Sequence, residues 1–231
     1  MTIKLYDLAG EDLEMRFSPF CWRTKLALAH KGLAFETIPW RFHEKEAIAE
    51  SGQPKVPVIV DGDKWIHDSW AIAEYLDEAY PDCPMLFAGP ETKAHIRFLD
   101  AWIGKVLFPA IAKSVMVPLQ DVIAEENRAY FRETREKVFG MTLEQLGELA
   151  PSAEEFYAML SPLRSVLAKQ PFLAGDAPDY GDYLLFGPFQ WARCSSPDEL
   201  LAADDPVAQW RGRVLDLYDG LGRNAPARCA A

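Results

Sequence analysis

Strand-like patterns in this chain of 231 residues stop at one short stretch that is rich in proline and glycine. Four such residues fall within ten positions: Pro81, Pro84, Gly89 and Pro90. Crowding of this kind is typical of a connection between folding units. Strand and helix patterns alternate before it, and only helical periodicity remains after it. We therefore predict an α/β domain over residues 1–82, a linker over 83–92 and an all-helical domain over 93–231.

The first part of the chain reads as strand, helix, strand, then a hairpin and a second long helix. Strands are expected over residues 3–6 and 35–38, and Ser18-Pro19 begins a helix between them that Gly32 ends. The Asp-Gly pair after residue 60 predicts the hairpin turn. The other expected elements are a short helix over 43–49, hairpin strands over 56–60 and 64–66, and a helix over 70–80.

Beyond the linker, apolar residues recur every three or four positions, as they do from Ile96 to Ala110 and from Val207 to Leu217. The most apolar long segment, residues 101–119, contains two lysines and two prolines, so we expect a buried helix rather than a membrane span. After Gly222 we expect a frayed tail.

Charge and cysteine content exclude several functions. The formal net charge of -11 argues against a nucleic-acid partner and against an anionic membrane surface, because both attract basic proteins. A local basic pocket for a small anion remains open. The four cysteines include no Cys-x-x-Cys pair, so no metal site is expected. The N-terminus lacks a signal-peptide pattern, so we expect a cytoplasmic protein.

The segment Ser18-Pro19-Phe20-Cys21-Trp22-Arg23 lies where thioredoxin-like proteins carry Cys-x-x-Cys, with serine in place of the first cysteine. Together with the order of elements, it resembles the glutathione transferase superfamily, whose members join a thioredoxin-like domain to an all-α domain. The resemblance is strongest over residues 1–90. It implies glutathione as co-substrate, a homodimer, and Ser18 as the residue that contacts the glutathione sulfur.

The physical chemistry of helix starts supports this role for Ser18. A free thiol has a pKa of about 8.5, and lowering that pKa by ~2 units takes about 2.7 kcal/mol. A helix N-terminus contributes about 0.3–1 kcal/mol, or up to ~2 when partly buried, and a hydroxyl hydrogen bond to the anion adds roughly 1.5–3 kcal/mol. Ser18 would stabilise the thiolate without being the nucleophile. The alternative is that Ser18 only caps its helix.

A second motif is Lys55-Val56-Pro57-Val58. In thioredoxin-like folds this proline is cis and lies opposite the helix start, which lets Val56 pair its backbone with the cysteinyl unit of glutathione. Only about 5–6% of such bonds are cis, so the assignment depends on the resemblance. A trans proline that enters an edge strand is the alternative.

A third motif, Asp68-Ser69, stands directly before the helix over residues 70–80. Asp68 suits the ammonium of the γ-glutamyl end of glutathione, and the Ser69 hydroxyl and amide suit its carboxylate. Taken alone, the pair would be an ordinary helix cap.

The glycine carboxylate of glutathione needs a cation or another donor. Lys45 is the first candidate, with Arg41 and His43 nearby, and Gln53 is a further donor. A solvated polar loop is the alternative for this stretch.

A fourth motif, Pro178-Asp179-Tyr180-Gly181-Asp182, resembles the capping box in the helical domain of the same superfamily. Asp179 stands where a serine or threonine is usual, and two acids near one helix start repel each other even though both favour its dipole. We assign this motif to folding rather than to chemistry.

A closer resemblance is to bacterial glutathione-dependent β-etherases, which cleave aryl ether bonds in lignin fragments with a glutathione thiolate. Four stretches carry it: residues 18–25, 68–77, 84–87 and 216–223. The electrophile site is expected between Ser18 and the helical domain. Its aromatic or soft lining would be Phe108, Met116, Tyr130 and Trp191, for each of which core packing is the alternative.

The expected function is therefore attack of enzyme-bound glutathione thiolate on a small apolar or aromatic electrophile, with aryl ether cleavage as a subtype. A non-catalytic glutathione-binding scaffold and thiol–disulfide exchange stay open, although serine at position 18 disfavours the exchange. Tyr6 is an alternative thiol partner. Cys21 is expected to be a buried, unreactive thiol.

Overall fold

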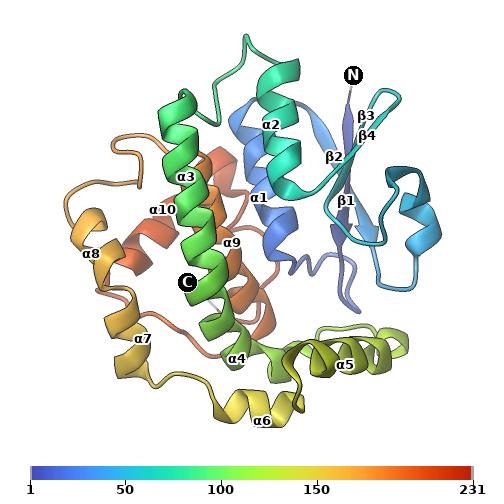
Figure 1. The fold of residues 1–231 in the computed structure, drawn as a ribbon, viewed down its shortest axis with the longest axis vertical. Coiled ribbons are helices and arrows are strands. Elements are labelled where there is room, and N and C mark those ends of the chain that lie inside the picture. Colours follow the sequence, from blue (N-terminus) through green and yellow to red (C-terminus); the bar gives the residue numbers. More distant parts are fainter. Residues whose placement is uncertain (1, 230–231) are drawn as a thin grey trace.

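A computed structural model describes residues 2–229, and it begins with a four-stranded sheet in the order β2-β1-β3-β4. The strands are β1 (Ile3–Leu8), β2 (Phe35–Trp40), β3 (Val58–Asp61) and β4 (Lys64–His67). Figure 1 shows α1 (Pro19–His30) and α2 (Ser69–Ala79) on one side of the sheet and the 3₁₀-helix η1 (Lys45–Ser51) on the other. This confirms the predicted thioredoxin-like arrangement.

Local chemistry explains where Pro39 is tolerated in the sheet, where the hairpin turns and where β3 starts. Strand β1 is parallel to β2 and antiparallel to β3. Pro39 has no N–H to donate, and it is tolerated because β2 is an edge strand. The predicted hairpin forms between β3 and β4, with Gly62 at φ +61° in its turn. Strand β3 starts at Val58, later than predicted, because Pro57 cannot contribute an N–H to the ladder.

The connection between the two parts of the chain is held by one buried carboxylate. Asp77 of α2 accepts the backbone N–H groups of Leu86 and Phe87, each at 3.0 Å, and the Lys31 ammonium lies 2.9 Å from it. Lys31 and Asp77 are both buried, so the pair and its two backbone donors satisfy one another away from water. The linker is therefore fixed against α1 and α2.

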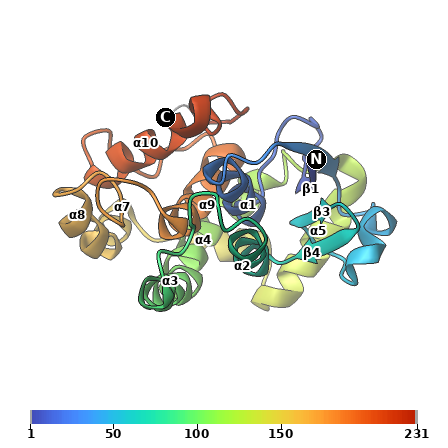
Figure 2. The ribbon, with the colours of Figure 1, turned by 90° about the horizontal axis from the view of Figure 1, so that it is seen from above.

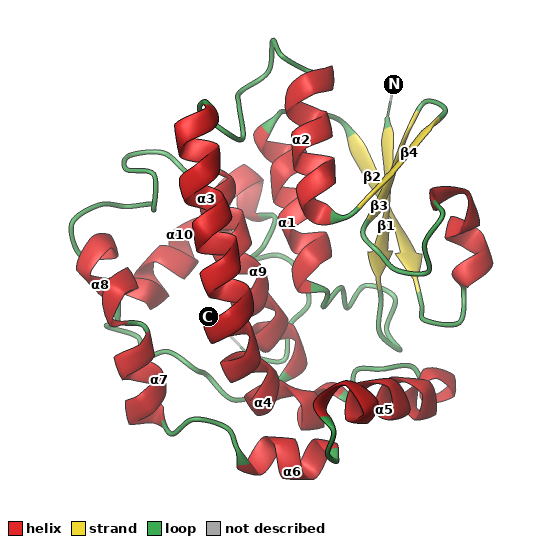
Figure 3. Ribbon diagram, in the orientation of Figure 1, coloured by secondary structure: helices red, strands yellow, loops and turns green. Residues whose placement is uncertain are grey.

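The second part of the chain is helical, as predicted (Figure 3). Its helices are α3 (Pro90–Trp102), α4 (Phe108–Leu119), α5 (Glu125–Phe139), α6 (Leu143–Glu148), α7 (Ala153–Met159), α8 (Ser161–Leu167), α9 (Tyr180–Ser195) and α10 (Pro206–Gly220). Figure 1 shows α5 across the lower end of the sheet, at a distance from α7 and α8. Helix α3 starts at Pro90, within the predicted linker.

A π-helical turn, η2 (Ile103–Leu107), joins α3 to α4. The Phe108 N–H donates to the Ile103 carbonyl, five residues earlier, so the helix takes up one extra residue at this point. The continuous run from residue 90 to 119 has the length and composition to cross a membrane, as core helices of globular proteins also can. It packs through α4 against α6 and α9.

Helix α9 is buried along its whole length and passes against the starts of both α1 and α2. A Cβ atom at Gly187 would lie 2.5 Å from the Pro19 carbonyl oxygen, so only glycine allows the two helices to approach this closely. The buried Tyr180 hydroxyl donates to the Ser69 carbonyl at 2.6 Å. Figure 2 shows α9 directly beside α1 from a second direction.

The segment after Gly222 is bound to the protein, so the prediction of a frayed tail was wrong within the described residues. The backbone N–H groups of Arg228 and Cys229 donate to the Arg193 carbonyl at 3.0 and 3.1 Å. The Arg193 side chain in turn donates to the Gly222 carbonyl at 3.0 Å. The segment covers the last turn of a buried helix, whose carbonyls would otherwise lack donors.

The predicted capping box at the start of α9 is present despite its two acids. Asp182 is fully buried and accepts three donors: the Leu173 N–H at 2.9 Å, the Asp179 N–H at 3.2 Å and the Trp210 indole N–H at 2.7 Å. Burial raises the pKa of Asp182 to about 6, and these donors oppose that rise.

Replacing this carboxylate tests its role in folding. Asp182→Ala leaves three buried donors without an acceptor, so we expect the free energy of unfolding to fall by roughly 3 kcal/mol in urea denaturation. Thr142→Ala, which removes an exposed capping box at the start of α6, should cost about 1 kcal/mol. Equal losses in the two variants would contradict the assignment.

Candidate functional site

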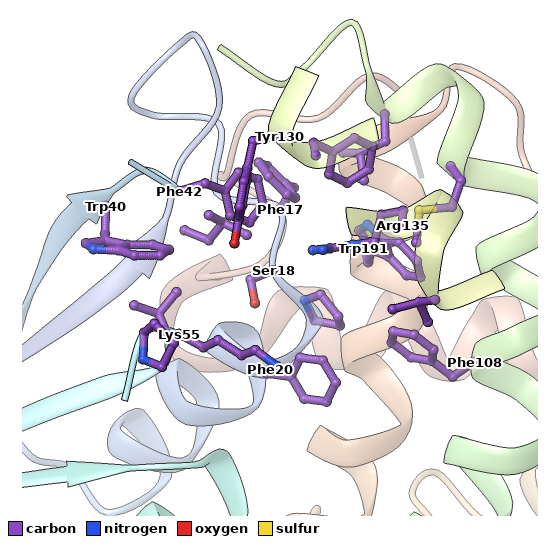
Figure 4. A pocket seen from close by; sticks show the side chains of 18 of the residues that line it. Phe17, Ser18, Phe20, Trp40, Phe42, Lys55, Phe108, Tyr130, Arg135 and Trp191 are labelled. Atoms are coloured by element: carbon purple, nitrogen blue, oxygen red, sulfur yellow. The ribbon is translucent and has the colours of Figure 1, made fainter. Parts of the chain in front are cut away.

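A cavity of about 380 Å³ lies between the sheet and the helices. One wall comes from the β1–α1 connection and residues 54–56, and the other comes from α4, α5 and α9. Aromatic and aliphatic side chains form most of its lining. Figure 4 shows Ser18 near the centre, with Trp40 and Lys55 on the sheet side and Phe108 and Trp191 on the helical side.

Ser18 caps α1, as the alternative interpretation of the sequence stated, and it also lines this cavity. Its Oγ accepts the Cys21 N–H at 3.3 Å, and Pro19 follows at the first helical position. A hydroxyl can accept one hydrogen bond and donate another, so the cap itself does not prevent Ser18 from donating to a group in the cavity. Ser18 is only 3% exposed, so a bound anion there would be shielded from water.

The Val56–Pro57 peptide bond is cis, as the resemblance implied. Pro57 is buried, and Val56 is half-buried and lines the cavity with Ser18. The two motifs, far apart in sequence, thus meet in one wall.

Asp68 and Ser69 stand at the start of α2. Asp68 has φ +69° and its Oδ1 accepts the N–H groups of Trp70 and Ala71, each at 3.0 Å. Asp68 is exposed, whereas Ser69 is buried. Neither residue lines the cavity that contains Ser18.

The four residues expected near the glycine carboxylate have different surroundings. The Lys45 ammonium lies 4.8 Å from the centre of the Tyr130 ring. The Gln53 amide donates to the Lys55 carbonyl at 2.6 Å. Arg41 donates to the Gly10 and Glu11 carbonyls and pairs with Glu126, and His43 contacts Asn127. Arg41 and His43 therefore connect the β2–η1 segment to its neighbours.

All four residues predicted for the electrophile site line the cavity: Phe108, Met116, Tyr130 and Trp191. Phe108 stacks on Trp191 with ring centres 4.9 Å apart and an angle of 18° between the planes. Phe20 extends the group, with its ring centre 5.7 Å from that of Phe108. In Figure 4 the Tyr130 hydroxyl points down toward Ser18. A planar aromatic compound suits such a wall.

Two cations in the lining were missed by sequence reasoning. Lys55 directly precedes Val56-Pro57, so its place beside the motif was a usable signal. Arg135 lies five residues after Tyr130 on α5. That helix is rich in charged residues, and nothing in its sequence distinguishes the one arginine that turns toward the cavity.

Tyr6, the alternative thiol partner, and the Cys21 thiol both lie outside the cavity lining. Tyr6 stacks on Trp65, with ring centres 5.7 Å apart, and it does not line the cavity. Cys21 is fully buried, and burial, followed by the charge of Asp7, raises the pKa of its thiol far above the usual range. These surroundings match the expectation of an unreactive thiol.

Family comparisons agree with the fold. The glutathione S-transferase N-terminal domain profile matches residues 13–85, and the C-terminal domain profile matches residues 94–219. A probable glutathione S-transferase of Nicotiana tabacum is 28% identical over 169 residues, which cover 72% of this chain and 63% of that protein. A glutathione S-transferase-like protein of Aspergillus flavus is 32% identical over 54% of this chain and 49% of its own length. The chain thus spans less than two thirds of these relatives.

Solved structures match over nearly the whole chain. Glutathione transferase GSTFuA3 of Phanerochaete chrysosporium has a TM-score of 0.73 and 27% identity, with 95% of this chain and 92% of that chain covered. The Ceriporiopsis subvermispora transferase CsGST83044, whose crystal structure is a complex with glutathione, has a TM-score of 0.75 at 24% identity, with 95% and 98% covered. Since the two domain profiles together cover most of the sequence, the chain belongs to the glutathione S-transferase family.

Proposed function

We propose that this protein is a glutathione transferase in which Ser18 stabilises the thiolate of bound glutathione for attack on an aromatic electrophile. The observation that carries the proposal is the position of one hydroxyl. Ser18 is buried in the wall of a cavity, at a helix start, and its oxygen accepts the Cys21 N–H. The helix dipole and the O–H donor would both favour a sulfur anion at this point.

The rest of glutathione would extend from Ser18 along the sheet domain. The backbone of Val56, beside the cis Pro57, would pair with the cysteinyl unit. Asp68 would bind the γ-glutamyl ammonium, and the start of α2 at Ser69 would bind its carboxylate. For the glycine carboxylate we propose Lys45 and Lys55, with Gln53 as a further donor whose amide already serves the Lys55 carbonyl.

The electrophile would occupy the aromatic side of the cavity, against Phe108 and Trp191. The sulfur then forms a bond to the electrophilic carbon, and the leaving group departs with the electron pair of the bond that breaks. Holding the two reactants in one cavity supplies much of the rate enhancement.

Ser18→Ala tests the proposal directly. The variant loses the O–H donor, so we expect the pKa of the enzyme-bound thiol to rise by about 1 unit or more. In turnover of 1-chloro-2,4-dinitrobenzene, kcat/KM near pH 6.5 should fall by roughly 10- to 100-fold, with a smaller loss at high pH, where the thiol ionises unaided. The ultraviolet absorbance of the bound thiolate, titrated against pH, measures the shift in pKa.

A matched control separates this effect from the loss of a helix cap. Ser152 also caps its helix by accepting the N–H three residues on, at 3.2 Å, and it lies at the start of α7, outside the cavity. Ser152→Ala should lower stability by about 1 kcal/mol and leave the thiol pKa unchanged. A thiol pKa in Ser18→Ala equal to that of the native protein would overturn the proposal.

Asp68→Asn tests the γ-glutamyl site. Asparagine keeps an oxygen that can accept the Trp70 and Ala71 N–H groups, so the cap should survive with little change in melting temperature. The variant loses only the negative charge, and we expect KM for glutathione to rise about 10-fold. Steady-state kinetics with glutathione varied measure this, and an unchanged KM would remove Asp68 from the site.

Cleavage of aryl ethers is a second candidate, favoured by the flat stack of Phe108 on Trp191. In that reaction the thiolate displaces a phenolate rather than a halide. Release of the phenol from an aryl ether only when glutathione is present would distinguish this subtype. A scaffold without activity would bind glutathione and turn over neither class of compound.

The same family membership supports a homodimer. Phe98 on α3 is 76% exposed, which is unusual for so large an apolar side chain and leaves room for a partner subunit. Analytical ultracentrifugation that finds only monomer would contradict the dimer and leave the proposed chemistry intact.

A further inference from the structure

The cavity carries positive charge although the protein is acidic. The chain has 35 aspartates and glutamates against 24 lysines and arginines. Lys55 and Arg135 nevertheless line the cavity, and none of its lining residues is acidic. Such a cavity attracts a negatively charged ligand in spite of the overall charge.

Arg135, on α5, is surrounded by aromatic rings rather than by acidic side chains. Its guanidinium lies 5.1 Å from the centre of the Phe131 ring and 5.6 Å from that of Phe42. Its Nη1 donates to the Thr134 hydroxyl at 3.0 Å. Within residues 2–229, no carboxylate comes within ion-pair distance of it. Acids are available on the same helix, but Glu136 pairs with Arg132 instead.

The surroundings of Arg135 leave its charge without compensation. Burial lowers the pKa of the Arg135 guanidinium, while the nearby Tyr130 hydroxyl raises it. Arginine nevertheless stays protonated in proteins. A half-buried cation that faces a cavity without a counter-ion is costly unless a ligand supplies the opposite charge. The Tyr130 hydroxyl, which points into the same cavity, is a second donor for such a ligand.

The position of Arg135 separates it from the proposed glutathione contacts. Val56, Lys55 and Asp68 all belong to the sheet domain, whereas Arg135 comes from α5. Figure 4 shows Arg135 on the side of Trp191 and Phe108, across Ser18 from Lys55. An anion at Arg135 is then either a group on the second substrate or the glycine carboxylate of glutathione, because Arg135 contacts the Phe42 ring and Lys45 lies on the neighbouring Tyr130 ring.

Building on the proposed function, we propose that the electrophile of this enzyme is an aromatic compound that carries a carboxylate, and that Arg135 is the specificity-determining residue which binds it. The ring lies against the Phe108–Trp191 stack, and the carboxylate accepts hydrogen bonds from the Arg135 guanidinium and the Tyr130 hydroxyl. A guanidinium presents two parallel N–H donors that match a carboxylate. The reacting carbon then faces Ser18 and the sulfur.

A defined pair of probes tests this assignment: 4-chloro-3-nitrobenzoate and its neutral analogue 4-chloro-3-nitrobenzamide. In both, the glutathione thiolate forms a C–S bond at the ring carbon that bears chlorine, the C–Cl bond breaks, and chloride leaves with the electron pair. The thiol proton has already passed to solvent. Each kcat/KM is divided by the uncatalysed rate constant of the same probe, which removes the difference in intrinsic reactivity.

The native enzyme should prefer the carboxylate by at least about 10-fold on this normalised scale. Arg135→Gln should lower kcat/KM for the carboxylate by about 10- to 100-fold and change that for the amide by about 2-fold or less. Arg135→Lys keeps the charge but cannot donate two parallel hydrogen bonds. Its kcat/KM for the carboxylate should therefore lie between the native and the Arg135→Gln values. Lys137→Gln removes one positive charge from an exposed position of the same helix, so it should change neither value.

The remaining outcomes separate this inference from the proposed function. If Arg135→Gln raises KM for glutathione and weakens both probes equally, Arg135 serves the glycine carboxylate and the inference falls. It falls also if the native enzyme turns over both probes without preference, in which case the transferase function stands. If calorimetry detects no glutathione binding and neither probe reacts, the proposed function falls and takes the inference with it.

Folding of the variant is checked by an independent measurement. Arg135 packs on two rings, so Arg135→Gln must keep the native near-ultraviolet circular dichroism before its kinetics are compared. Calorimetry of the native protein alone, with S-(4-carboxybenzyl)glutathione and its carbamoyl analogue, gives a test without any variant. Equal dissociation constants for the two conjugates would overturn the assignment.

Discussion

The whole arrangement depends on one buried helix that touches both helix starts of the sheet domain. Helix α9 meets the first turn of α1 at Gly187, where a Cβ would collide with the Pro19 carbonyl, and it holds the start of α2 through the bond from Tyr180 to Ser69. The helical domain therefore sets the distance between the proposed sulfur site and the proposed γ-glutamyl site. In a closely packed interior such a contact does not deform gradually. The separation between these two proposed contacts is thus fixed by Gly187 and Tyr180, which belong to neither of them.

Sequence reasoning recovered the parts of this molecule that have local causes. The caps at Ser18 and Asp68, the turn at Gly62 and the box at Asp182 each follow from a few neighbouring residues, and all are present. The four residues expected at the electrophile site line the cavity that contains Ser18. Which residues hold glutathione stays a prediction.

The missed features depend on contacts between distant segments. The bound segment after Gly222 is ordered by the Arg193 carbonyl, which no local pattern reveals. Arg135 differs from Arg132 in facing the cavity and in having no ion-pair partner within residues 2–229. Periodicity gives the face of a helix but not the neighbour that fills it. A charged residue in a polar helix therefore reads as solvent-exposed until the tertiary structure is known.

The π-turn between α3 and α4 sets the rotational phase of α4. It is a one-residue insertion within a continuous helix, and it lies immediately before Phe108. Gaining or losing that residue would rotate everything beyond it by roughly 100° about the helix axis, since a turn holds 3.6 residues. This single wide turn thus sets the angle at which the Phe108 ring meets the cavity and its neighbour Trp191.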